Sequence, residues 1–478
     1  MQGITRRKAL QVVAAAAACG TVRPVLSHAV SGNSVEAVLE LGEKIGPTMP
    51  NDFVGLSYES AQLADSAFFS AANTGLVKEF RKLTPCGSLR LGGTLSDFTE
   101  WWDPAVREKK PWISDSAIQG MSRFEWRLTT PKVAAEKYAV ITPESIRELR
   151  GFLDATGWNV IYGLNLGTGT PERAAAEGTC VARILDDKLT AFQVGNEPDL
   201  FSRRLRSYRW NCSSYWDEGQ EFAKAVRRQV PNVAFTGPDS AGPGWLQPFA
   251  ELAQGQPKFL SAHHYPMGPA GAPGISVEKL FAQRPAFQRY LETAQRAMKV
   301  HNLPCRITEA NSCYHGGLPG VSDSFAAALW VIDFMSQSAQ ASVCGVNLHG
   351  GGMDGIYSPI IGDAAAGYTA RPITTGMAFV NEFIGATFIE SEFNSGSANA
   401  VAYVAEKSEV RLFAIVNKSS TTLRCTFQGR QGVRLKSAML LTALNLSSTS
   451  NIEQRDISVD LNFLSVPPYS AVLARSAV

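Results

Sequence analysis

Two glutamates follow short apolar runs of the sequence, and each is placed to present a carboxylate at the end of a strand. The segment Ala191–Pro198 reads AFQVGNEP and contains Glu197. The segment Cys305–Ser312 reads CRITEANS and contains Glu309. A helix-capping role would explain an acidic residue at 197, but it would not explain the asparagine before it and the proline after it. We therefore expect both carboxylates to be catalytic.

A pair of carboxylates can divide the cleavage of a glycosidic bond between them. If the two groups lie about 5–5.5 Å apart, one of them attacks the anomeric carbon and the product keeps the configuration of the substrate. We assign this nucleophilic role to Glu309. Glu197 is then the acid/base, which holds a proton at the start of the cycle and later takes a proton from water.

Strand-like and helix-like segments alternate between residues 49 and 384, which predicts an α/β fold of the (β/α)8 TIM-barrel type. Thr142 as N-cap and Pro143 in the first turn predict a helix over Pro143–Thr156, and another is expected over Tyr215–Gln229. Glu197 and Glu309 would follow the fourth and seventh strands and meet at the barrel mouth. The eight expected strands cover Phe53–Leu56, Ser88–Leu91, Asn159–Leu164, Ala191–Val194, Val233–Thr236, Phe259–Ala262, Cys305–Thr308 and Cys344–Asn347.

Residues 385–478 change to alternating strands without helices between them, which predicts a C-terminal β-sandwich domain. An alternating segment at Ser34–Leu41, within residues 30–48, is expected to add a strand to that domain. The expected C-terminal strands are Ala400–Val404, Val410–Asn417, Thr422–Gln428, Ser437–Thr442, Ile457–Leu461 and Ala471–Ala474.

Five motifs together resemble glycoside hydrolase family 79 of clan A, and the resemblance extends over nearly the whole chain after the leader. They are LRLGGTLSDF at 89–98, GNEPDLF at 195–201, HHY at 263–265, ITEANSCYHGGLPG at 307–320 and NLHGGGMDGIYSPI at 347–360. The family includes β-glucuronidases and heparanases. The resemblance implies a retaining exo-β-glucuronidase acting on terminal β-linked glucuronic acid, with a heparanase-like endo-β-glucuronidase as the alternative. It implies no cofactor.

The same resemblance implies roles for residues around the sugar. Asn196 would hydrogen-bond the 2-hydroxyl, Tyr265 would contact the nucleophile, and His263 would support both. The far hydroxyls are expected to meet Glu59, Thr94 and Asp97. The substrate carboxylate lies beside two acidic groups, so it is expected to be bound by uncharged donors from Tyr314, His315, Gly316, Gly317 and Tyr357. Heparanase has two glycines where this chain has His315 and Gly316.

Charge and composition exclude several other kinds of function. The formal net charge is +2, with 45 Lys and Arg against 43 Asp and Glu, which argues against a nucleic-acid partner. We see no stretch outside the N-terminus that is long and apolar enough to span a bilayer. The pair His263 and His264 suggests a metal, but we find no third ligand at suitable spacing, so we predict no metal site.

The N-terminus resembles a twin-arginine export signal over residues 1–29. Arg6 and Arg7 precede an apolar run, and Ala29 ends a small-residue pattern suited to signal peptidase. We therefore predict an exported protein, periplasmic or secreted, with lipidation of Cys19 as an alternative. The cysteines that follow lack paired metal-site spacing and are odd in number, so we expect most of them to be buried thiols.

Four arginines follow the Glu197 motif, at the place where heparanase carries lysines that touch its sulfated substrate. A charge run is usually a solvated surface, and contact with a polyanion is the alternative. Two other readings of the chain stay open: a non-catalytic carbohydrate-binding protein on a hydrolase scaffold, and a clan A hydrolase acting on arabinose or xylose. The four residues are Arg203, Arg204, Arg206 and Arg209.

Overall fold

The computed structural model describes residues 34–106, 125–136, 139–351, 355–429, 433–460 and 463–478. The predicted export signal at 1–29, with Cys19, lies outside these residues, and export stays a prediction. Within the described part of the chain, no helix has both the length and the apolar character needed to cross a membrane. The seven cysteines of this part are all free thiols, and four of them are buried.

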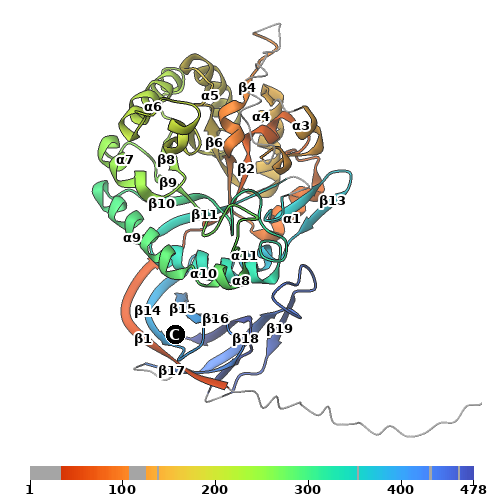
Figure 1. Ribbon diagram of the computed structural model, residues 1–478, viewed down its shortest axis with the longest axis vertical. Helices are drawn as coiled ribbons and strands as arrows, with labels where there is room; N and C mark the ends of the chain where they lie inside the picture. The colour runs from red at the N-terminus through yellow and green to blue at the C-terminus, as the bar shows by residue number, and fades with distance from the viewer. Residues whose placement is uncertain (1–33, 107–124, 137–138, 352–354, 430–432, 461–462) are drawn as a thin grey trace, which may run out of the picture. The chain divides into compact units, whose positions relative to one another are not determined.

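Eight parallel strands close into a barrel, and helices surround it, which confirms the predicted fold (Figure 1). Each expected strand is present. Its bounds match the prediction or differ from it by a few residues at either end. The strands are β2 (Val54–Glu59), β3 (Ser88–Gly92), β6 (Asn159–Leu164), β7 (Leu189–Val194), β8 (Phe235–Ser240), β9 (Leu260–His264), β10 (Cys305–Ala310) and β11 (Val343–His349). The helices that alternate with them are α1 (Thr74–Leu83), α4 (Pro143–Thr156), α5 (Pro171–Leu185), α6 (Cys212–Arg227), α7 (Leu246–Ala253), α9 (Arg284–His301), α10 (Phe325–Gln340) and α11 (Ile373–Asn381).

Helix α4 shows how local sequence sets an element of the barrel. The Thr142 side chain accepts a hydrogen bond from the Ser145 backbone N–H, the Ser145 hydroxyl accepts one from the Thr142 backbone N–H, and Pro143 occupies the first turn. These contacts satisfy backbone groups that a helix start leaves free. Gly157 ends the helix in the left-handed conformation with φ 79°, which favours glycine. The helix has the bounds that its capping residues predict.

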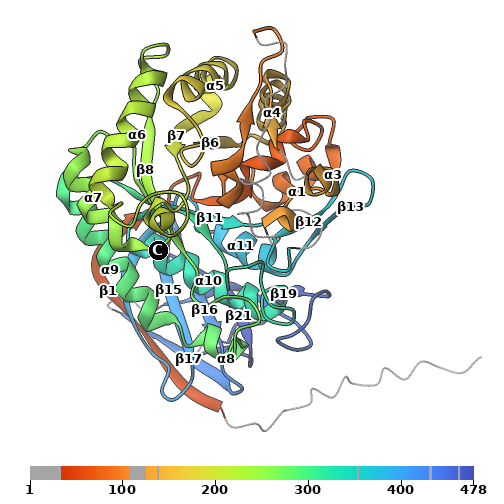
Figure 2. The same cartoon turned by 45° about the horizontal axis from the view of Figure 1, so that its top comes forward.

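A nine-stranded sheet contains the N-terminal strand and the strands that follow the barrel, in the order β19-β18-β21-β16-β15-β14-β1-β17-β20. Strand β1 pairs antiparallel with β14 and parallel with β17. The predicted β-sandwich is therefore built from one curled sheet that includes the N-terminal strand (Figure 2). Its strands are β1 (Ser34–Thr48), β14 (Thr387–Asn394), β15 (Ala400–Lys407), β16 (Val410–Asn417), β17 (Thr422–Gln428), β18 (Leu435–Thr442), β19 (Glu453–Ile457), β20 (Leu464–Val466) and β21 (Ser470–Ala477).

Side chains alternate between two apolar cores along the central strands of this sheet. In β16, Leu412 and Ala414 belong to the core shared with the barrel, whereas Phe413 and Ile415 belong to a core formed by the sheet alone. Helix α10 packs beside the sheet on the barrel side, and its residues from Phe325 to Ala339 are all buried. A helix that is covered on all sides has no solvent-exposed face to fill with polar residues, which explains the mainly apolar sequence of α10.

One sheet prediction is wrong, and two strands of the sheet, β14 and the short β20, were not predicted. We expected a strand over Ile457–Leu461, but β19 runs over Glu453–Ile457 instead. The side chains of β19 are mostly exposed, so this edge strand carries no apolar alternation that could reveal it. Strand β14 was not predicted, although its side chains alternate in burial and its exposed positions include Glu390 and Glu392. It pairs with β1, which lies far from it in the sequence.

A buried ion network joins the sheet to the barrel wall at Asp333 of α10. Lys418, which follows β16, lies 2.6 Å from one Asp333 carboxylate oxygen, and the side chains are only 2% and 5% exposed. Arg284 and the Tyr403 hydroxyl bind the other oxygen. Burial alone would raise the pKa of Asp333, but Lys418 and Arg284 outweigh this and lower it. The carboxylate is therefore ionised at neutral pH.

Replacing Asp333 with alanine should lower the free energy of unfolding by about 3–5 kcal/mol, because Lys418 would stay buried without its counter-ion. Urea denaturation followed by fluorescence would measure this change. The matched control is the double variant Asp333→Leu with Lys418→Met, which should recover most of the loss because apolar pairs replace buried ion pairs at little cost. A single variant as stable as the parent protein would contradict the assigned role.

Candidate active site

The acid/base candidate Glu197 sits in a tight turn at the carboxyl end of β7. Gly195 has φ 77° and Glu197 has φ 48°, so two of three consecutive residues are left-handed. A side chain at 195 would also press against Leu166, whose nearest atom lies 3.0 Å from the position of an added Cβ. The Glu197 backbone N–H donates to the Asp239 carbonyl at 2.9 Å. The turn directs the Glu197 carboxylate into the barrel mouth, where its side chain is 19% exposed.

The nucleophile candidate Glu309 lies within β10 and is held by two donors. The Tyr265 hydroxyl donates to one carboxylate oxygen at 2.8 Å, as predicted for this tyrosine. The Arg90 guanidinium donates to the other oxygen at 2.7 Å. Burial by itself would raise the pKa of Glu309. The nearby His349, His263 and Arg90 outweigh burial and hold that pKa well below its ordinary range.

The two glutamates meet at the mouth as the sequence predicts. One carboxylate oxygen of Glu197, one of Glu309 and a ring nitrogen of His263 all lie within 4.8 Å of one another. His263 Nδ1 lies 3.0 Å from Glu197 and 4.0 Å from Glu309. The two carboxylates thus face a common space, and His263 lies beside both.

This group of three side chains offers ligand atoms of the kinds that bind metal ions. Its charges are already balanced by protein groups, because Arg90 binds Glu309 and the histidine contacts Glu197. Asp239 binds the second nitrogen of His263 at 3.0 Å, so both ring nitrogens have partners. The arrangement fits a hydrogen-bonded catalytic pair better than a metal centre.

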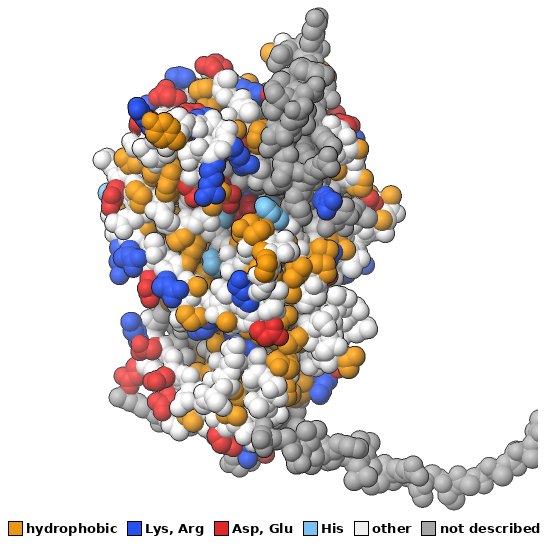
Figure 3. Space-filling view, viewed as in Figure 1, with side chains coloured by type: hydrophobic (Ala, Val, Ile, Leu, Met, Phe, Trp, Pro, Cys, Tyr) orange, Lys and Arg blue, Asp and Glu red, His pale blue; other side chains and the backbone are white. Residues whose placement is uncertain are grey.

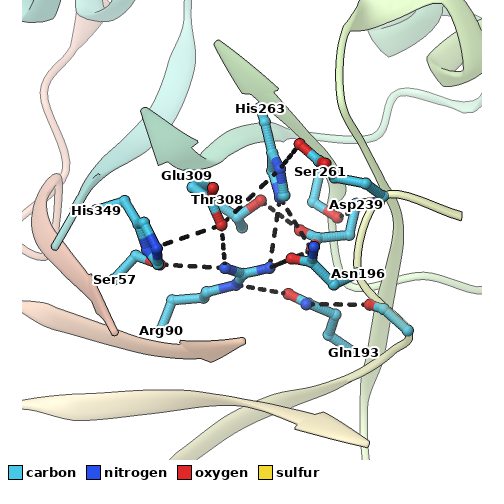
Figure 4. Close-up of polar contacts among 12 residues, drawn as sticks. Ser57, Arg90, Gln193, Asn196, Asp239, Ser261, His263, Thr308, Glu309 and His349 are labelled. Atoms are coloured by element: carbon cyan, nitrogen blue, oxygen red, sulfur yellow. Dashed lines mark hydrogen bonds and ion pairs between the residues drawn. The ribbon is translucent and has the colours of Figure 1, made fainter. Parts of the chain in front are cut away.

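Arg90 donates hydrogen bonds to several side chains at the centre of the site, and the sequence analysis did not identify it (Figure 4). It projects from β3 with 0% exposure and links the nucleophile to the acid/base turn. Its pKa is raised, because Asp239 and Glu309 outweigh the effect of burial. A single arginine inside the apolar run LRLGG is a signal that could have been used, since a charged group buried in a barrel strand needs partners. Those partners are Glu309, Asp239, Asn196, Ser57 and Gln193.

Asp239 was also missed, because the predicted fifth strand ended at Thr236. In the structure β8 continues to Ser240 and places Asp239, with φ 58°, close to His263 and Arg90 beneath Glu197 and Glu309. The side chain is fully buried. Burial would raise the pKa of Asp239, but Arg90 and His263 outweigh it and lower that pKa. The sequence around it, TGPDS, is typical of a turn and gave no sign of a buried charge.

The residues expected at the sugar hydroxyls have different surroundings. Asn196 is buried, and its amide oxygen accepts from Arg90 at 2.7 Å, so its amide nitrogen is the group left to donate to a ligand. Glu59 accepts from the Leu95 backbone N–H at 2.8 Å. Burial raises the pKa of Glu59, and His349 opposes this effect. Thr94 is half-buried at the start of the short helix η2 (Thr94–Phe98).

Asp97 supports the acid/base turn from below. Its two carboxylate oxygens accept backbone N–H groups, from Gly167 at 3.0 Å and from Asn196 at 3.3 Å. The side chain is fully buried, and burial raises the pKa of Asp97 to about 7. These contacts place Asp97 behind Asn196 and occupy the oxygens that the sequence assigned to sugar hydroxyls.

The loops after β10 and β11 carry the residues expected to bind a substrate carboxylate. Tyr314 is 40% exposed at the rim, His315 is exposed, and Tyr357 is buried. The backbone turns left-handed at His315, Gly316 and Gly317, with φ of 61°, 81° and 88°. The rings of Tyr314 and Tyr357 each lie 6.3 Å from that of Tyr265. The structure therefore gathers these residues beside the nucleophile.

Asn311 ties these two loops together. Its side-chain amide donates to the carbonyls of His349 at 2.8 Å and Tyr357 at 3.0 Å. The Tyr357 N–H in turn donates to the Gly316 carbonyl at 2.9 Å. His349, which sequence reasoning missed, lies 2.9 Å from the Ser57 hydroxyl and 3.7 Å from Glu309. The position of Tyr357 is thus set by both loops.

The arginine segment after Glu197 divides into structural and exposed residues. Arg206 binds Glu218 at 2.5 Å, donates to the carbonyls of Leu166 and Gly167, and covers the ring of Trp210. It therefore holds the loop. The exposed members are Arg203, Arg204 and Arg209. Figure 3 shows acidic and histidine side chains in a hollow over the middle of the barrel, with basic side chains near it.

Known proteins resemble this chain in part of its sequence and in its fold. No family model matches the chain. A β-glucuronidase from Aspergillus niger is 28% identical over 225 residues, which are 41% of this chain and 41% of that enzyme. Heparanase from Bos taurus is 22% identical over 329 residues, which are 61% of this chain and 59% of that protein. The matches thus span less than two thirds of the length of these relatives.

Solved structures with the same architecture match almost the whole chain. A 4-O-α-L-rhamnosyl-β-D-glucuronidase from Fusarium oxysporum gives a TM-score of 0.68 at 16% identity and covers 91% of this chain and 99% of its own. A family 51 α-L-arabinofuranosidase from Bifidobacterium longum gives 0.69 at 15% identity and covers 93% and 100%. The sequence is similar to β-glucuronidases and heparanases, as its motifs indicate, and the fold is that of barrel glycoside hydrolases.

Proposed function

We propose that the protein is a retaining exo-β-glucuronidase that removes terminal β-linked glucuronic acid from glycans or glycoconjugates. The observation that carries this proposal is the approach of Glu197 and Glu309 oxygens to within 4.8 Å at the barrel mouth. Inverting enzymes place their carboxyl groups about 6.5–9.5 Å apart to leave room for water. The shorter approach favours direct attack by one carboxylate.

In the first step, Glu309 attacks the anomeric carbon while the glycosidic C–O bond breaks. Its lowered pKa keeps it ionised for this attack. Glu197 transfers its proton to the departing oxygen, so the leaving group departs as an alcohol. The contacts from Arg90 and Tyr265 fix the orientation of the attacking carboxylate.

In the second step, water attacks the anomeric carbon of the glycosyl-enzyme and displaces the Glu309 carboxylate. Glu197 takes the proton that the water loses, which restores both groups to their starting states. Asn196 supports the transition state if its free amide nitrogen donates to the sugar 2-hydroxyl, a contact that strengthens as positive charge develops on the sugar.

Specificity for glucuronate rests on the loops after β10 and β11. The similarity to β-glucuronidases supports a uronate substrate, as do Tyr314 and Tyr357 beside the nucleophile. A carboxylate on the substrate is repelled by Glu197 and Glu309, so donors without negative charge are needed to hold it. Tyrosine hydroxyls and the N–H groups of the 315–317 turn can supply them.

The proposal is tested by the sugar that the enzyme removes. Purified protein should release nitrophenol from the aryl β-glucuronide and not from the β-glucoside or the α-arabinofuranoside. Proton NMR of the early reaction should show the β-anomer of glucuronic acid as first product. Cleavage of the arabinoside alone would contradict the uronate site, binding without turnover would favour a carbohydrate-binding protein, and an initial α-anomer would contradict retention.

Endo cleavage of an acidic polysaccharide is the second candidate, and the exposed arginines favour it. Arg203, Arg204 and Arg209 follow Glu197 in the sequence and are exposed, so their cationic groups are available to an acidic polysaccharide. Sizing the products of a glucuronate-containing polysaccharide separates the two modes. Free glucuronic acid as the early product supports exo action, whereas a rapid fall in mean chain length supports endo action.

A further inference from the structure

A buried chain of contacts connects Asp239 to the acid/base through His263. One carboxylate oxygen of Asp239 lies 3.0 Å from His263 Nε2 (Figure 4). His263 Nδ1 lies 3.0 Å from Glu197 Oε1. Asp239 also accepts the backbone N–H of Glu197 at its own carbonyl. Asp239 therefore holds Glu197 at both its backbone and its side chain.

Asp239 cannot reach a substrate, because it is fully buried and both of its carboxylate oxygens have partners. The Thr308 hydroxyl donates to Oδ1 at 2.5 Å. Arg90 donates to Oδ2 at 2.5 Å, beside the His263 contact. Any effect of Asp239 on the reaction must therefore pass through a neighbouring side chain.

The partners of His263 decide which of its nitrogens carry protons. An ionised carboxylate only accepts hydrogen bonds, so the 3.0 Å contact to Asp239 places a proton on Nε2. Burial would lower the pKa of His263, but the charges of Asp239 and Glu309 outweigh it and raise that pKa to about 10. Arg90, 3.4 Å from Nε2, is the cation that faces the ring. The ring thus carries both protons near neutral pH, and Nδ1–H donates to Glu197.

We propose that Asp239 is a positioning residue for the acid/base Glu197. It fixes the His263 ring so that Nδ1–H donates a hydrogen bond to Oε1 of Glu197. The other oxygen, Oε2, then stays available to exchange protons with the leaving group and with water. The inference rests on the proposed glycosidase function. It assigns a role to Asp239, a residue that does not contact the sugar. His263 keeps both of its protons throughout. The proton that moves belongs to Glu197 Oε2 in the first step and returns there from water in the second.

A competing role for Asp239 runs through Arg90. Asp239 and Glu309 both bind the Arg90 guanidinium, so loss of the Asp239 charge could disturb the nucleophile instead. The two roles differ in how they depend on the leaving group. Proton donation matters most when the leaving group is a poor one, whereas nucleophilic attack is needed for every substrate.

The test is the variant Asp239→Asn, measured with phenyl, nitrophenyl and dinitrophenyl β-glucuronides. The quantity to compare is kcat/KM, because it reports the step in which the leaving group departs. We expect kcat/KM to fall by about 30-fold or more for the phenyl substrate and by less than about threefold for the dinitrophenyl substrate, within the range that a positioned acid contributes. A fall of similar size for all three substrates would overturn the inference.

Two further variants keep the test decisive. Tyr265→Phe removes a hydrogen bond to the nucleophile, so its kcat/KM should fall by a similar factor for all three leaving groups. His263→Gln breaks the link from Asp239 without altering the Asp239–Arg90 pair, and it should reproduce the leaving-group dependence of Asp239→Asn. If Asp239→Asn does not fold, His263→Gln decides by comparison with Tyr265→Phe, because His263 also helps to lower the pKa of Glu309. A loss in His263→Gln that depends on the leaving group no more than the loss in Tyr265→Phe would overturn the inference.

The test of Asp239 can be separated from the test of the proposed glucuronidase function. If the parent protein cleaves another aryl β-glycoside and not the glucuronide, the substrate proposal is wrong. The same three leaving groups on the accepted sugar then test Asp239. A leaving-group-dependent loss still supports its positioning role, and a uniform loss overturns it.

Discussion

Changing Glu309 to glycine should reduce kcat by about four to six orders of magnitude, the size of loss that follows removal of a catalytic nucleophile. The variant cannot form the covalent intermediate, and Arg90 loses the carboxylate it binds at 2.7 Å. Steady-state rates with nitrophenyl β-glucuronide would measure the loss. Thermal unfolding should show that the variant remains folded, which separates lost chemistry from lost structure.

Azide gives this variant a stereochemical test. A small anion can occupy the space vacated by the Glu309 side chain and attack the anomeric carbon directly. A single displacement inverts the configuration, so an aryl β-glucuronide should yield the α-glucuronyl azide, which NMR identifies. Formation of the β-azide would reverse the assignment of the two glutamates. A glycine variant with near-normal kcat would exclude Glu309 as nucleophile.

Changing Glu197 to alanine should produce a loss that depends on the leaving group. We expect kcat/KM to fall by about 10²–10⁴-fold for phenyl β-glucuronide, which is the usual contribution of a positioned acid. Dinitrophenyl β-glucuronide should lose far less, because its leaving group departs without a proton. The second step still lacks its base, so kcat for the activated substrate should also fall and the glycosyl-enzyme should accumulate as a burst of dinitrophenol.

Azide should rescue this variant with the opposite product. It needs no general base, so it can attack the accumulated glycosyl-enzyme from the side that water normally uses. Two successive inversions give the β-glucuronyl azide, and kcat should rise with azide concentration. Asp199→Asn is a matched control two residues away, where burial raises the pKa to about 6 and the carboxylate caps the Ala241 N–H. Azide rescue of the control, or equal losses of Glu197→Ala on both substrates, would refute the assignment.

The local sequence specifies the barrel and the positions of Glu197 and Glu309 to a large degree. Eight apolar runs form the barrel strands, and the segments between them form helices that begin at caps such as Thr142 and Pro143. Both kinds of element depend on short-range contacts, so local patterns predict them. In parallel strands the carboxyl ends gather at one mouth, and Glu197 and Glu309 each follow a predicted strand. Their proximity therefore follows from the topology once the eight strands are recognised.

Other features depend on contacts between residues far apart in the chain. Arg90 reaches Glu309 and Asp239 only after the barrel closes, and nothing next to it in sequence marks those partners. The edge strand β19 has exposed side chains, so only its pairing with β18 defines it. Periodicity reports which side of an element is buried. The partner that covers that side, and the charges it brings, follow from the three-dimensional packing alone.

For Glu197 and Glu309, local sequence thus fixes where the two carboxylates stand, and tertiary packing fixes the charge of Glu309. A buried ionisable group takes its protonation from every charge within a few ångströms, and those charges come from strands throughout the barrel. Glu309 is ionised because Arg90 from β3, His263 from β9 and His349 from β11 surround it. No segment of the chain contains that environment by itself.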